Sequence, residues 1–119
     1  MLDTLPRTLL RLEGLAVGAG ALALYVHSGF GWILFAAHAL APDISFLGYA
    51  AGPRVGAACY DALHTTVLPI ALGVVGVLTG ADPAVQVALI WLLHIGVDRA
   101  LGYGLKYPTR FEDTHLQRV

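Results

Sequence analysis

Four long apolar stretches, at about 8–27, 30–50, 53–79 and 83–104, fill most of this 119-residue chain and restrict what it can fold into. Each stretch is close to the roughly 20 residues that an α-helix needs to cross a bilayer. Only 13% of the residues are charged, against about 25% in soluble domains, so the chain has too few charged residues to cover a surface that faces water. We therefore predict one all-α domain over residues 1–119, an integral membrane four-helix bundle with a cytoplasmic tail at 105–119.

Other features of the chain exclude several classes of protein. Basic residues precede the first apolar stretch as in a signal peptide, but Glu13 interrupts this stretch and three more spans follow, so we expect it to be retained. The lone cysteine, Cys59, excludes an intramolecular disulfide and a thiolate cluster. A net charge of −1 gives no indication of nucleic-acid binding. Pro69 lies inside the third stretch and predicts a kink there.

The basic residues predict the orientation of the chain in the membrane. If the four helices run up and down, the N-terminus, the connection near 50–54 and the C-terminus share one side. The other two connections, at 27–32 and 79–83, contain no lysine or arginine. The positive-inside rule then places both termini in the cytoplasm of a multi-pass protein of the bacterial inner membrane. The residues on the basic side are Arg7, Arg11, Arg54, Arg99, Lys106, Arg110 and Arg118.

Acidic residues and histidines inside the spans are predicted to lie at one level of the bundle. With a rise of about 1.5 Å per residue, their depths are roughly 8–17 Å from the cytoplasmic helix ends. Asp61 and His64 are spaced i and i+3, and His94 and Asp98 are spaced i and i+4, so each pair shares a helix face. The residues at this level are Glu13, Asp43, Asp61, His64, His94 and Asp98.

This set of side chains predicts a metal site. Two helices each supply one carboxylate and two each supply a carboxylate–histidine pair, which is close to the ligand set of carboxylate-bridged two-metal bundles. Oxygen and imidazole donors without sulfur suit iron, manganese or zinc. We expect a mono- or dinuclear centre of Glu13, Asp43, Asp61, His64, His94 and Asp98. Arg54 and Arg99, with Arg11, would orient these ligands or bind an anionic substrate.

The metal centre predicts a membrane oxidoreductase or hydrolase acting on a lipid or another hydrophobic small molecule. Two alternatives remain open. Glu13 or Asp61 would exchange protons in a small proton-coupled transporter, or the arginines and carboxylates would form structural ion pairs that fix the helix register. His38 is expected to be a core histidine. A homodimer is also consistent with four short helices, which leave little room around a central cavity.

Two segments resemble a bacterial family of small four-helix membrane proteins, the domain of unknown function 4260. They are "APDISFLGYAAGPRVGAACYDALHTTVLP" (41–69) and "HIGVDRALGYGLKYPTRFEDTHL" (94–116). The resemblance covers nearly the whole chain and implies the four-helix topology, without an activity. It also implies that several residues stand at family motif positions. Because some of these lie in the tail, the tail becomes a stronger candidate for a part of the site. These residues are Asp43, Gly48, Tyr49, Gly52, Arg54, Gly56, Tyr60, His64, His94, Asp98, Arg99, Lys106, Phe111 and His115.

Overall fold

The computed structural model describes residues 4–119, and the regular elements in this range are helices. Four of its segments are long and apolar enough to cross a membrane, which confirms the all-α prediction and the four predicted stretches: Leu5–His27, Trp32–Ala51, Pro53–Thr79 and Asp82–Leu101. The elements are α1 (Leu5–His27), α2 (Trp32–His38), the 3-10 helix η1 (Ala41–Ala51), α3 (Pro53–His64), α4 (Val67–Thr79), α5 (Asp82–Leu101) and α6 (His115–Arg118).

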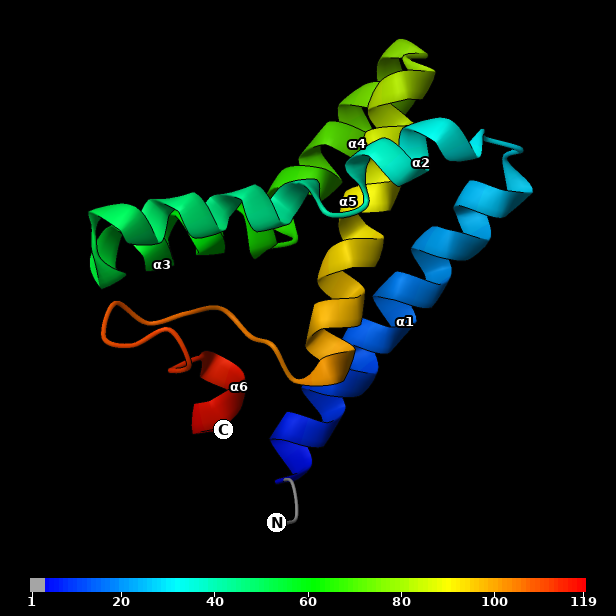
Figure 1. Ribbon diagram of the computed structural model, residues 1–119. Coiled ribbons are helices and arrows are strands. Elements are labelled where there is room, and N and C mark those ends of the chain that lie inside the picture. The colour runs from blue at the N-terminus through cyan, green and yellow to red at the C-terminus, as the bar shows by residue number, and fades with distance from the viewer. Residues whose placement is uncertain (1–3) are drawn as a thin grey trace.

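Glycines allow α1 and α5 to pack closely in the lower part of the view in Figure 1, below the point where the two helices diverge. Gly14 and Gly18 on α1 face Gly96 on α5, and a Cβ on Gly96 would lie 2.5 Å from the Gly18 nitrogen. The Gly14-x-x-x-Gly18 spacing therefore acts as a small-residue face that brings two helix backbones together. The other side of α5 packs against α4, so α5 is the central helix of the molecule.

The second predicted helix, 30–50, is wrong as a single α-helix because the chain breaks between α2 and η1. Proline lacks the backbone N–H, and its ring collides with the carbonyl of the residue four positions earlier in an α-helix. For Pro42 that residue is His38, where α2 ends. The chain then continues from Ala41 as the tighter 3-10 helix, an unusually long one.

The third predicted helix, 53–79, is divided in the same way. We predicted a kink at Pro69, but the break lies at Thr65 and Thr66, and Thr65 has the extended angles φ −80° and ψ 146°. Thr65 is four residues before Pro69, so the proline ring would collide with the Thr65 carbonyl in a continuous α-helix. The proline therefore ends α3 rather than bending one continuous helix.

These two breaks change the predicted four-helix bundle. η1 and α3 pair with each other as a hairpin that turns at Gly52 (φ 111°) and projects to one side of α5 (Figure 1). α1, α4 and α5 form the upright part of the molecule. The structure is thus an upright group of three helices with a side hairpin, and the hairpin meets α5 near the two breaks.

The C-terminal tail folds back beneath the hairpin instead of extending freely (Figure 1). Lys106 and Thr114 form an isolated antiparallel bridge, and Leu116 is fully buried. The Arg7 side chain of α1 donates to the carbonyls of Leu116 and Gln117 at 2.6 and 3.0 Å. The tail is therefore a packed part of the fold.

Candidate metal centre

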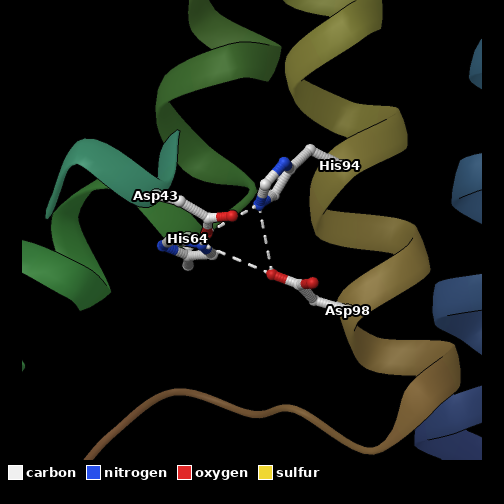
Figure 2. A group of neighbouring side chains, drawn as sticks. All are labelled: Asp43, His64, His94 and Asp98. Atoms are coloured by element: carbon white, nitrogen blue, oxygen red, sulfur yellow. Dashed lines mark hydrogen bonds and ion pairs between the residues drawn. The ribbon is translucent and has the colours of Figure 1, made fainter. Parts of the chain in front are cut away.

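Four of the predicted ligand residues converge where the side hairpin meets α5. Figure 2 shows Asp43 and His64 from the hairpin facing His94 and Asp98 from α5. Each offers one nitrogen or oxygen atom, and these four atoms all lie within 4.8 Å of one another. The cluster is well enclosed, since the exposed fractions of the side chains are 0% for His64, 6% for His94, 18% for Asp98 and 37% for Asp43.

The two chain breaks position half of the cluster. Asp43 stands in the first turn of η1, directly after Pro42, and its N–H donates to the carbonyl of Leu40. His64 is the last residue of α3. His94 and Asp98 come from successive turns of α5, and the i, i+4 spacing puts both side chains on its hairpin-facing side. Asp43 and His64 each stand next to one of the two breaks. The breaks therefore bring the ligand atoms of the hairpin close to those of α5.

The spacing of the four atoms fits one metal ion. The His64 Nε2 atom lies 3.3 Å from Asp43 Oδ1 and 3.4 Å from Asp98 Oδ2. The His94 Nε2 atom lies 3.1 and 3.3 Å from the same two oxygens. Ligands about 2.0–2.1 Å from a tetrahedral ion are separated from one another by roughly 3.3–3.4 Å. The four nitrogen–oxygen distances are close to this value, and the two remaining pairs, Nε2 to Nε2 and oxygen to oxygen, lie within 4.8 Å.

Backbone carbonyls select the histidine tautomer that suits a ligand. His64 Nδ1 lies 2.9 Å from the Tyr60 carbonyl, and His94 Nδ1 lies 2.7 Å from the Ala39 carbonyl. A carbonyl only accepts hydrogen bonds, so Nδ1 donates and the Nε2 lone pair of the neutral ring faces the carboxylates. Such lone pairs repel carboxylate oxygens unless a cation lies between them. Either one proton on each Nε2 or one divalent ion satisfies all four atoms.

Side chains of α5 stabilise the broken end of α3 on both sides of the cluster. Trp91 Nε1 donates to the Leu63 carbonyl at 2.6 Å, and Arg99 Nη2 donates to the His64 carbonyl at 2.8 Å. Carbonyls in the last turn of a helix have no partner within the helix, so these donors replace the missing bonds. The Tyr60 ring also stacks on the His64 ring with centroids 3.8 Å apart. The position of His64 is therefore fixed by contacts to its ring and by a hydrogen bond to its backbone carbonyl.

The structure leaves the two predicted catalytic arginines outside direct contact with the cluster atoms. Arg99 donates to the carbonyls of His64 and Tyr103, so it positions His64 through the backbone. Arg54 is exposed in the first turn of α3. Ten residues of helix, about 15 Å, separate it along the axis from His64.

Asp61 and Glu13 also lie outside the cluster. Asp61 Oδ1 accepts a 2.6 Å hydrogen bond from the Lys106 N–H, so its carboxylate is directed to the tail. Residues three apart differ by about 60° around a helix axis, which allows Asp61 and His64 to face different partners. Glu13 is exposed on α1 and lines a separate cavity together with Arg99 and His115. His38 bonds to the Leu34 carbonyl and borders another, apolar cavity.

The tail holds a buried basic residue that the sequence analysis did not single out as functional. Lys106 is 8% exposed, and its Nζ donates to the Phe111 carbonyl at 2.6 Å. The same atom lies 3.4 Å from the centre of the Phe111 ring and 4.6 Å from that of Tyr60. Burial lowers the pKa of Lys106. In the sequence, Lys106 is one of the basic residues and one of the positions implied by the family resemblance.

His115 connects the tail to the cavity beside Arg99. Its Nδ1 accepts a 2.8 Å hydrogen bond from the Leu105 N–H. Burial, together with the Arg99 guanidinium, lowers the pKa of His115. At the tail surface, the Arg118 guanidinium holds the pKa of Asp113 well below its usual range through a bidentate ion pair with bonds of 2.9 and 2.7 Å.

Comparison with known proteins gives one match. A family model described as "Domain of unknown function (DUF4260)" matches residues 7–119. No curated protein and no solved structure matches the chain. The match covers nearly the whole sequence, including every residue of the cluster, and so the chain belongs to the DUF4260 family.

Proposed function

We propose that this protein is an integral membrane metalloprotein that holds one divalent metal ion between Asp43, His64, His94 and Asp98. The observation that carries the proposal is the alternating ring of two imidazole nitrogens and two carboxylate oxygens, spaced 3.1–3.4 Å apart. The two Nδ1 bonds to carbonyls support it, because such bonds orient histidine ligands around protein-bound metals.

The donor set restricts the ion. Two imidazoles and two carboxylates without sulfur suit zinc, iron or manganese. Two carboxylates also neutralise one divalent ion, which makes the burial of the charges in an apolar chain tolerable. One ion is proposed because the two further acids predicted for a dinuclear centre, Glu13 and Asp61, lie outside the cluster.

The ion would make the protein a membrane enzyme. With water or substrate as a fifth ligand beside the four protein atoms, a bound divalent ion would supply Lewis acidity or an activated water, and iron or manganese would also supply redox chemistry, so the two reaction classes are hydrolysis and oxidation or reduction. The chain's own part is to orient both imidazoles and to enclose the ion. We further propose that the four apolar segments insert in the bacterial inner membrane with both termini in the cytoplasm, because Arg7 and Arg11 lie near the N-terminus and Lys106, Arg110 and Arg118 lie in the C-terminal tail.

Elemental analysis of the purified protein tests the proposal. We expect about one metal ion per chain, and a loss of at least about 90% of this metal in His64→Ala and in His94→Ala, since each change removes one of four ligands. His38→Ala is the matched control, because His38 is a half-buried histidine of the neighbouring helix α2 and its ring lies outside the cluster. Metal-free wild type, or equal metal in His38→Ala and His94→Ala, would refute the metal centre.

A further inference from the structure

A groove in the surface leads to the cluster. Three of the four ligand residues, Asp43, His94 and Asp98, line a cavity of about 250 Å³ between α2 and α5. The rest of its lining is apolar and consists of Phe35, Ala39, Leu40, Ile90, Leu93 and Val97. The ion proposed above would therefore border an apolar space.

The burial of the ligands shows the same open side. The two carboxylates that border the groove are 37% and 18% exposed, for Asp43 and Asp98. His64, which does not line the groove, is fully buried under the ring of Tyr60. A molecule approaching a bound ion would thus arrive along the groove, beside the carboxylates.

The rim of the groove faces the surface that lipid would cover. Leu40 is 72% exposed and Val97 is 46% exposed. Both belong to segments that are long and apolar enough to cross a membrane. By contrast, the cavity that contains Glu13, Arg99 and His115 includes none of the four ligand residues. The groove beside the ligands therefore opens toward apolar surroundings.

We infer that the metal centre acts on an amphiphile from the bilayer, whose polar group binds the ion as a further ligand beside the four protein atoms, while its apolar part lies in the groove between α2 and α5. This inference rests on the proposed metal centre. At about 250 Å³, the groove is smaller than the roughly 300–1,000 Å³ of sites that enclose a drug-sized ligand. The groove therefore holds only the part of the amphiphile's apolar chain that is next to its polar group. The rest of the chain stays in the lipid.

Hydroxamates provide probes with a metal-binding group and a variable chain. The protein is loaded with cobalt(II), whose visible spectrum reports both the bound ion and an added ligand, and is titrated with octanohydroxamate and with acetohydroxamate in the same detergent. Val97→Phe fills the groove. Val55→Phe is the matched control, because Val55 is 44% exposed on α3 and does not line the groove.

We expect Val97→Phe to keep one cobalt ion and to bind octanohydroxamate at least about tenfold more weakly, while acetohydroxamate changes by less than about threefold. Val55→Phe should bind both probes like the wild type. Partition into detergent is identical for all variants and cancels in these ratios. Leu40→Trp, on the exposed rim, gives a second test that leaves the packing of α5 unchanged, and the same selective loss is expected.

Failure of this inference can be told apart from failure of the metal centre. Absence of cobalt binding in the wild type overturns the metal centre and, with it, the groove. Bound cobalt with no octanohydroxamate binding in the wild type overturns the groove alone. The groove is also overturned if Val97→Phe and Leu40→Trp weaken the binding of both hydroxamates equally, or if they weaken the binding of neither.

Discussion

Replacing Asp98 by asparagine removes one charge from the cluster and leaves its shape almost unchanged. Asp98 Oδ2 lies 3.4 and 3.3 Å from the two Nε2 atoms, so the carboxylate is one of the four proposed ligands of the ion. Loss of a supporting residue around a metal ligand typically costs about 10–100-fold in affinity. Loss of a charged ligand itself should cost at least the upper value, about 100-fold.

This loss converts into a thermal shift. An ion present at 100 times its dissociation constant stabilises the folded protein by about 2.7 kcal/mol. For a chain of 119 residues each kcal/mol raises Tm by roughly 4 °C, so saturating zinc should raise the wild-type Tm by about 10 °C. After a 100-fold loss, the same zinc concentration equals the dissociation constant and contributes only about 0.4 kcal/mol, or about 2 °C.

The assay compares unfolding of the purified variants with zinc and with a chelator. Asp61→Asn is the matched control, because it removes the same charge one turn before His64 and keeps an oxygen that can accept from the Lys106 N–H. It should retain the full shift of about 10 °C. If zinc stabilises Asp98→Asn as much as the wild type, or if Asp61→Asn loses the shift instead, the assignment of the ligands is wrong.

Three other changes test the surroundings of the cluster. Trp91→Phe removes the donor to the Leu63 carbonyl, so we expect a loss of about 1–3 kcal/mol in stability and weaker zinc binding at unchanged stoichiometry, measured by unfolding and titration. Gly96→Val should cost about 3 kcal/mol or more because its Cβ meets the Gly18 backbone; Gly20→Val, in open space, is the control. The pKa of His115 is lowered in the folded chain, so the packed tail favours the neutral imidazole ring. The stability that His115 gives to the tail is therefore complete above the ordinary histidine pKa near 6.5 and is lost as the pH falls below that value. Limited proteolysis of residues 105–119 should therefore accelerate on acidification, and less so in His115→Gln; a tail that is cleaved faster at alkaline pH would contradict this.

The sequence was sufficient to predict the four apolar segments and the level at which polar groups gather. Rise per residue gives the depth of a side chain along its helix, and this places Asp43, His64, His94 and Asp98 together. It gives no information on direction around the axis. Glu13 has a similar depth, but the glycine contacts between α1 and α5 turn it away from the cluster.

The breaks could be foreseen only in part. Pro42 and Pro69 are visible in the sequence, but a proline can bend a helix or end it. Which outcome occurs depends on donors for the freed carbonyls, and at the end of α3 these come from Trp91 and Arg99, 28 and 35 residues later. In the same way, the bond between Asp61 and Lys106 joins residues 45 positions apart and leaves no periodic signal.

The cluster divides evenly between two bodies of the fold: two of its residues belong to the side hairpin, and two belong to α5. Elsewhere the hairpin and the upright helices touch sparsely. A metal ion at this place would join the two bodies directly, next to the hydrogen bonds by which Trp91 and Arg99 already hold the end of α3 to α5. Metal occupancy would then stiffen the junction between the hairpin and α5 in addition to supplying chemistry.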